Sequence, residues 1–272
     1  MMWTTLPLAA ALALTAAQPP AAGDLNLSNV RRVYGELGGT RPDAPLLPGD
    51  VLTLAFDIEG ITVTDDGKAA YTMAMDTLDK SGKTWFKQDP APLKDTVPLG
   101  GRRIPARAYV AVGFQQPAGE YVMRVTVTDD ATKAKKVIDH KYTVLPPGFG
   151  VVGVNTSYDD RNRLSAPTSG VVGQAVFLHF GVVGFQRDPK TKQPKVTAEM
   201  VITDEAGKPT LPKPQVVALE GGVDEKEPTF FIMFFLPMTR PGKFTVNLKV
   251  TDTVASKTAT YSLPVTVSPP VN

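Results

Sequence analysis

The feature that most constrains this chain is a phrase of alternating apolar and polar residues that occurs twice. Residues 119–130 read GEYVMRVTVTDD, and residues 242–253 read GKFTVNLKVTDT. Every second residue is apolar in both copies, which is typical of a β-strand with one buried face. A polar turn and another β-rich run follow each phrase, so each predicts the first strand of a hairpin.

The two phrases belong to longer matching blocks. GDVLTLAFDIEG (residues 49–60) resembles GQAVFLHFGVVG (173–184), and the blocks 71–83 and 196–208 end in the similar turns DKSGK and DEAGK. The blocks predict an internal repeat of one module, with residues 24–146 and 147–268 as the two domains and LPPG (145–148) as the joint. The segments after residue 24 show no convincing helical period. We therefore predict an all-β chain of two tandem antiparallel β-sandwiches.

The phrase PAGEYVMRV in the first copy resembles the signature of strand F in immunoglobulin-like domains. Tyr121 occupies the position whose hydroxyl closes the tyrosine corner, and Met123 occupies that of the second cysteine. In the second copy these positions hold Phe244 and Val246, and the chain has no cysteine. The resemblance is therefore to the disulfide-free immunoglobulin-like and fibronectin-type-III-like modules of bacterial exported proteins. It implies a fold and leaves the function open.

The N-terminus predicts export. LPLAAALALTAA (residues 6–17) is an uncharged apolar run, too short to span a bilayer and suited to the core of a signal peptide, which we place at residues 1–17. The preceding residues, MMWTT, lack the usual Lys or Arg, so a hydrophobic leader or short anchor is the alternative. We expect a periplasmic, cell-surface or extracellular protein, with no membrane span in the mature chain.

Composition and motifs give no indication of a catalytic, metal-binding or nucleic-acid-binding site. The net charge of +2 gives no field for binding nucleic acid. His140 and His179 lie in different modules, so a shared metal site is not expected, and no catalytic or cofactor-binding residue is predicted. His140 is interpreted as a half-buried strand residue. Four paired acids are expected at the tip of the first module: Asp65, Asp66, Asp129 and Asp130. Their carboxylates could hold Ca²⁺. The alternative is that they are solvated turn residues, since lysines in the same loops would neutralise them.

Two further segments raise the question of binding. The loop GFQRDPKTKQPK (184–195) is expected to point toward the first module and to make a polar contact with it. The pair Trp85 and Phe86 follows the first hairpin turn, where aromatic side chains could stack on sugar rings. The ordinary alternative is one core and one partly exposed aromatic.

The two copies differ most at TFFIMFFL (229–236), which we align with ARAYVAVG (106–113). This alignment predicts that Phe231, Met233 and Phe235 point inward. The opposite face of this stretch and of the neighbouring strand in block 173–184 would then carry an apolar patch made of Phe177, Phe230, Ile232 and Phe234. Such a patch is unusual on a soluble monomer. Either the chain covers it internally, or it docks a protein partner or a second copy through domain 2.

The sequence therefore favours a non-enzymatic exported structural or protein-binding protein. The alternative is a carbohydrate-binding or secreted enzyme accessory protein.

Overall fold

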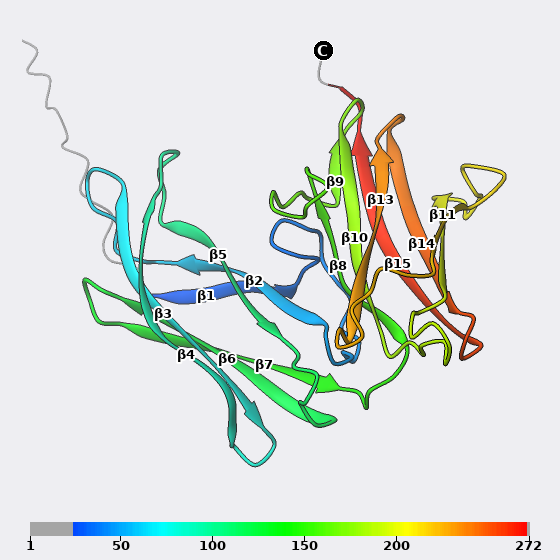
Figure 1. Ribbon diagram of the computed structural model, residues 1–272. Coiled ribbons are helices and arrows are strands. Elements are labelled where there is room, and N and C mark those ends of the chain that lie inside the picture. The colour runs from blue at the N-terminus through cyan, green and yellow to red at the C-terminus, as the bar shows by residue number, and fades with distance from the viewer. Residues whose placement is uncertain (1–23, 271–272) are drawn as a thin grey trace, which may run out of the picture.

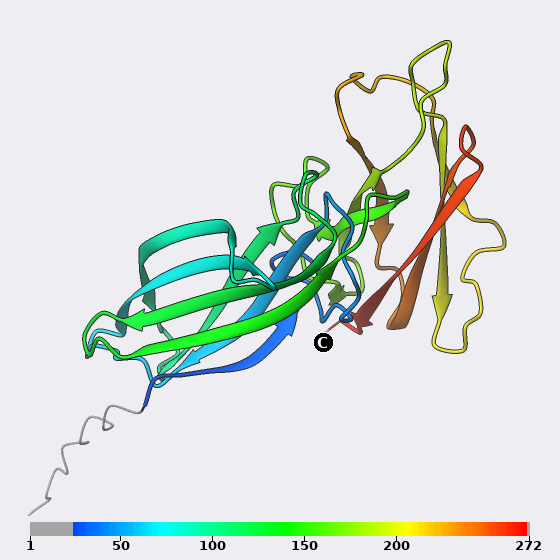
Figure 2. The ribbon, with the colours of Figure 1, turned by 90° about the horizontal axis from the view of Figure 1, so that it is seen from below.

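The computed structural model describes residues 24–270, and the predicted signal peptide lies outside them. The described residues form fifteen strands and no helix, so none of them forms a helix long and apolar enough to cross a membrane. The strands build two β-sandwiches, joined between β7 and β8 and lying at an angle to one another (Figures 1 and 2). The expected all-β fold of two tandem antiparallel sandwiches is confirmed.

Domain 1 consists of a three-stranded and a four-stranded sheet with the orders β1-β2-β5 and β4-β3-β6-β7. Their inward side chains form one hydrophobic core around Phe56, Met123 and Val125. The strands are β1 (Asn26–Arg32), β2 (Val51–Glu59), β3 (Lys68–Asp79), β4 (Thr84–Thr96), β5 (Arg103–Ala111), β6 (Gly119–Asp129) and β7 (Lys135–Val144).

Domain 2 has the corresponding orders β8-β10-β13 and β12-β11-β14-β15, with β9 added in parallel beside β15. Its core includes Leu178, Phe180 and Val246. The strands are β8 (Gly150–Ser157), β9 (Ser169–Val171), β10 (Ala175–Val183), β11 (Val196–Asp204), β12 (Gln215–Leu219), β13 (Thr229–Pro237), β14 (Gly242–Asp252) and β15 (Lys257–Ser268).

The opening phrase forms β6, and its alternation is the observed burial pattern. Tyr121, Met123, Val125 and Val127 are buried, whereas the residues between them are partly exposed. The hydroxyl of Tyr121 donates a hydrogen bond of 2.8 Å to the carbonyl of Pro117, which is the predicted tyrosine corner. Met123 is fully buried at the position of the missing cysteine.

The two domains share a polar and aromatic interface. Tyr34 belongs to domain 1 by sequence, but its ring packs into the core of domain 2 and lies edge-on to Tyr261 at 6.3 Å. Asp50 forms a buried ion pair with Arg41 and accepts a hydrogen bond of 2.9 Å from the backbone N–H of Gly153 in β8. Burial alone would lower the pKa of Arg41, but its hydrogen bonds with Asp50 outweigh this effect and the net shift is upward.

Candidate functional site

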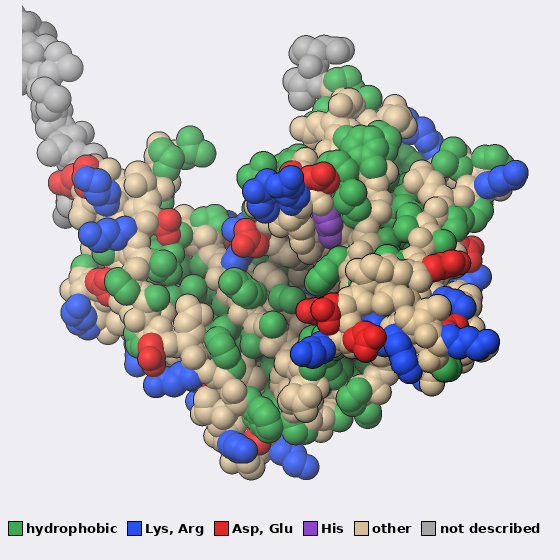
Figure 3. All heavy atoms as spheres, in the orientation of Figure 1, with side chains coloured by type: hydrophobic (Ala, Val, Ile, Leu, Met, Phe, Trp, Pro, Cys, Tyr) green, Lys and Arg blue, Asp and Glu red, His purple; other side chains and the backbone are tan. Residues whose placement is uncertain are grey.

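The most unusual surface of the described residues is an apolar face on β10 and β13. Phe231, Met233 and Phe235 are 71%, 45% and 52% exposed, and Phe177 is partly buried beside them. The rings of Phe177 and Phe235 lie 5.2 Å apart as a cross-strand pair. We call these four residues the outer aromatic face. Hydrophobic side chains gather over β10 and β13 in the space-filling view (Figure 3).

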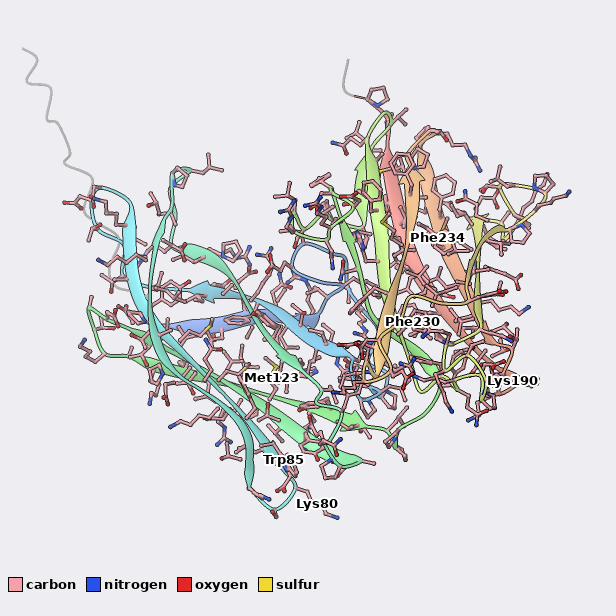
Figure 4. The ribbon with its side chains drawn as sticks, in the orientation of Figure 1. Lys80, Trp85, Met123, Lys190, Phe230 and Phe234 are labelled. Atoms are coloured by element: carbon pink, nitrogen blue, oxygen red, sulfur yellow. The ribbon has the colours of Figure 1, made fainter. Side chains whose placement is uncertain are left out.

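The pairing of β13 with β10 decides which side chains form this face. Phe180 pairs with Ile232 and Leu178 pairs with Phe234, so the even-numbered residues of β13 point into the core with those of β10. Phe230 and Phe234 accordingly lie on the side of β13 that faces the second sheet (Figure 4).

The predicted patch is therefore wrong in three of its four residues. Phe230, Ile232 and Phe234 are 6%, 4% and 4% exposed and belong to the core, whereas Phe177 lies on the outer face as expected. A strand has a side-chain period of two, so an alignment shifted by an odd number of residues exchanges its faces.

A loop of unequal length caused the shift. The connection from β13 to β14 is shorter than that from β5 to β6, so the spacing of the opening phrases does not hold for the preceding strands. In domain 1 Leu54 pairs with Ala108, and in domain 2 Leu178 pairs with Phe234. The structural counterpart of Ala108 is therefore Phe234. The length of this loop is the sequence signal that separates the two alignments.

A buried polar cluster lies beside the outer aromatic face. His179 is buried, and its Nε2 lies 2.8 Å from the hydroxyl oxygen of Ser157. That hydroxyl donates to the carbonyl of Asp159, so Nε2 carries the proton and donates to Ser157. Burial lowers the pKa of His179, which favours the neutral ring. A protonated Nε2 cannot act as a base toward Ser157, and Ser157 is itself inaccessible.

His140 has a structural role in domain 1. It is half-buried on the face of β7 that carries Ile138 and Tyr142, as predicted. Its Nε2 accepts a hydrogen bond of 3.0 Å from Nε of the buried Arg32. Burial, followed by the positive charge of Arg32, lowers the pKa of His140. The ring is held in its neutral form.

The acidic side chains at the tip of domain 1 form local hydrogen bonds and an ion pair. Asp129 is buried and accepts hydrogen bonds from Thr62 and from the backbone of Ala131. Burial alone would raise the pKa of Asp129, but these hydrogen bonds outweigh it and the pKa is lowered. Asp66 pairs with Lys68. Between residues 24 and 270 no group of three or more His, Cys, Asp or Glu residues could hold a metal ion.

The expected contact of loop 184–195 with domain 1 is wrong. Among the described residues, its hydrogen bonds and ion pairs are formed within domain 2. Arg187 donates to the carbonyls of Asp224 and Glu227, and Lys195 pairs with Asp188 at 2.7 Å. Lys190, in the same loop, lies on the side of domain 2 away from domain 1 (Figure 4). The Arg187 bonds tie the loop to the segment that precedes β13.

Trp85 lies near the end of domain 1 where the β3–β4 turn is found (Figure 4). Its indole N–H donates to Asp79, its ring meets Tyr121 edge-on, and the amine of Lys83 lies over the ring at 4.9 Å. Phe86 is exposed on the next position of β4. The Lys83 amine occupies one side of the indole that a sugar ring would use for stacking.

No protein-family model and no curated protein matches this sequence. Among solved structures, the chain is similar to the transglutaminase of red sea bream, with 13% identity, a TM-score of 0.29 and coverage of 90% of this chain and 31% of that chain. It thus spans about a third of the transglutaminase.

Two streptococcal domains show a comparable similarity. One is the C-terminal domain of the antigen I/II polypeptide BspA of Streptococcus agalactiae, at 10% identity and a TM-score of 0.30, covering 89% of this chain and all (100%) of that domain. The other is the C-terminal domain of the antigen I/II-family protein AspA of Streptococcus pyogenes, at 9% identity and 0.30, covering 90% and 100%. Scores this low carry no argument about function.

Proposed function

We propose that this chain is a non-enzymatic, exported structural or protein-binding protein related to the disulfide-free immunoglobulin-like and fibronectin-type-III-like modules. We further propose that the outer aromatic face of domain 2 is its contact with a protein partner. The exposure of Phe231, Met233 and Phe235 on one short strand carries this proposal. Clusters of aromatic and Met side chains are enriched in protein interfaces.

The energetics favour a covered face. Fully burying one large apolar side chain is worth about 1.5–3 kcal/mol relative to leaving it exposed. The three most exposed side chains retain roughly half or more of that surface in water, so a partner that covers them gains a few kcal/mol, on the order of 1 kcal/mol for each. The strand that carries them is paired to β10 along its full length, so little ordering is needed on binding.

The absence of enzymatic activity is supported by the histidine environments. Ser157 and His179 are buried, with the proton of His179 on the nitrogen that faces the Ser157 hydroxyl. The Nε2 atom of His140 accepts a hydrogen bond from Arg32 and is therefore not free to accept a proton from a substrate. Export is supported by the apolar run at residues 6–17.

The test is affinity capture from the native cell envelope with matched variants. Met233→Asp places a charge in the outer aromatic face, and Tyr109→Asp places one at an exposed position of β5 in domain 1, on the strand that corresponds to β13. We expect Met233→Asp to lose partners that the unmodified chain and Tyr109→Asp both retain. Recovery of the same partners with all three proteins would refute the role of the face.

A further inference from the structure

Strand β13 is an edge strand with a free hydrogen-bonding margin. It stands first in the sheet order β13-β10-β8, and β10 is its one partner in that sheet. The strand at the other edge of this sheet, β8, contacts domain 1 through Gly153 and Asn155. Domain 1 therefore packs against the far side of the sheet, and β13 forms the margin opposite to it (Figure 1).

The register identifies which backbone groups point out of this margin. The N–H of Met238 donates to the carbonyl of Gln174 and its carbonyl accepts from the N–H of Gly173, so Met238 lies at the position of a hydrogen-bonded pair at the end of the ladder. Such pairs alternate along an antiparallel ladder with pairs whose backbone groups point away from the partner. The outward-pointing backbone groups of β13 therefore belong to its odd-numbered residues. These are the N–H and C=O of Phe231, Met233 and Phe235 and, at the two ends of the strand, those of Thr229 and the C=O of Pro237.

No hydrogen bond from another part of the described chain reaches these groups. Phe231, Met233 and Phe235 also carry exposed side chains. The outer edge of β13 thus combines unpaired backbone hydrogen-bonding groups with a row of exposed apolar side chains.

The corresponding strand of domain 1 has a protected edge. The N–H of Val112 donates to Asp50 and its carbonyl accepts from Gly49, which places the outward backbone groups of β5 at its odd-numbered residues. Among these are Pro105, which has no N–H to donate, and the charged Arg103 and Arg107. Proline and charged side chains are devices by which edge strands avoid pairing with other chains.

The middle of β13 lacks these devices, and its one proline, Pro237, is the last residue of the strand. By the observed pairings, the counterparts of Pro105 and Arg107 are Phe231 and Met233. Residues 229–236 contain neither proline nor charge. A long, uncharged edge strand invites the addition of another strand.

We infer that β13 pairs with β13 of a second copy of this chain, antiparallel and about a two-fold axis at Met233. This inference rests on the proposed role of the outer aromatic face and names its partner. The outward row is Phe231, Met233, Phe235, which reads the same in both directions. An antiparallel pairing centred on Met233 sets each Phe231 opposite Phe235 of the second copy, as an isologous contact requires. The facing residues exchange backbone hydrogen bonds and join two three-stranded sheets into one.

A row without charge favours such a self-complementary partner. Recognition of a different protein normally uses complementary charges along the edge for orientation and choice of partner. Here the three outward side chains carry none.

The first test is the molar mass of the purified full chain by light scattering across a concentration series. The chain is expected to approach the mass of a dimer as concentration rises. The double variant Phe231→Pro, Met233→Arg copies the edge of domain 1 and is expected to remain a monomer, with an unchanged circular dichroism spectrum as the check of folding. The control Tyr109→Arg, at an outward position of β5, is expected to dimerise like the unmodified chain. A monomeric unmodified chain, or a dimer that survives the double variant, overturns the inference.

The second test reads the register and does not depend on a disruptive variant. The chain has no cysteine, so Met233→Cys introduces a single thiol. The inferred pairing sets the two copies of residue 233 opposite each other at a Cα distance of about 5.5 Å, within the range of a disulfide. Mild oxidation should give a disulfide-linked dimer from Met233→Cys and none from Tyr109→Cys. Equal cross-linking of both variants, or none, overturns the inference.

The two proposals fail separately. A chain that stays monomeric but still loses captured partners with Met233→Asp overturns the self-pairing and leaves the protein-binding function in place.

Discussion

Two neighbouring residues of β13 provide the sharpest test of how domain 2 is built. Phe234 is 4% exposed and stacks on Phe180 with ring centroids 6.2 Å apart, whereas Phe235 is 52% exposed beside Phe177. Both are phenylalanines on one strand, so strand propensity is the same for both. Replacing each by alanine therefore measures the burial of one side chain against the exposure of the other.

The expected costs differ several-fold. Phe234→Ala removes a fully buried ring and leaves a cavity among Phe180 and its neighbours, which costs about 3–5 kcal/mol. Phe235→Ala loses a cross-strand aromatic contact and the burial of half a ring, which together cost about 1 kcal/mol. For a domain of this size, roughly 4 °C of melting temperature corresponds to 1 kcal/mol. The two variants should thus melt about 12–20 °C and about 4 °C below the unmodified chain.

Differential scanning calorimetry measures these shifts, and circular dichroism at 25 °C confirms that each variant is folded before heating. The protein concentration must be low and equal in all samples because association of the outer face would raise the melting temperature. Equal shifts for the two variants, or a larger shift for Phe235→Ala, would refute the assignment of faces on β13. The inferred edge and its outward row would fall with it.

Two other perturbations test domain 1 and its contact with domain 2. Asp50→Asn leaves Arg41 buried without its ion pair and is expected to cost about 3–5 kcal/mol, seen by calorimetry as earlier unfolding; an unchanged profile would contradict a structural role for the pair. Burial and the charge of Arg32 lower the pKa of His140 below its ordinary 6.5, so the unfolded chain takes up the proton first and stability falls as the pH drops through 6.5 toward the lowered pKa. His140→Leu should reduce this loss in thermal unfolding between about pH 7 and 5, and an unaltered pH dependence would contradict the assignment.

Local sequence patterns predicted much of this fold because the signals were unambiguous. In β6 every second residue from Tyr121 to Val127 is apolar and most of the residues flanking them are polar, so Tyr121 and Met123 are assigned to the core face. The tyrosine corner could be read from a single short phrase, since both the ring and its acceptor Pro117 lie within a few residues. The position of His140 on the buried side of β7 followed from the same alternation.

The candidate site was predicted on the right strands and on the wrong face. In TFFIMFFL both sets of alternate residues are apolar, so the period of two gives no preference for either side. The residues of β10 that pair with this stretch decide it, and they lie about fifty positions earlier in the chain, from Val183 opposite Thr229 to Val176 opposite Leu236. The packing of Tyr34 against Tyr261 and the Asp50–Gly153 bond between the domains are also long-range contacts with no local signal.

The sequence by itself determined the all-β character, the two sandwiches and the presence of excess apolar surface on β10 and β13, because alternation and turn residues act over a few positions. Only the tertiary structure decided that Phe231, Met233 and Phe235 lie outside while Phe230, Ile232 and Phe234 fill the core. The physical reason is that register is a property of two strands together. A shift by one residue exchanges every inward side chain for an outward one, and the chain resolves that choice only when β13 pairs with β10.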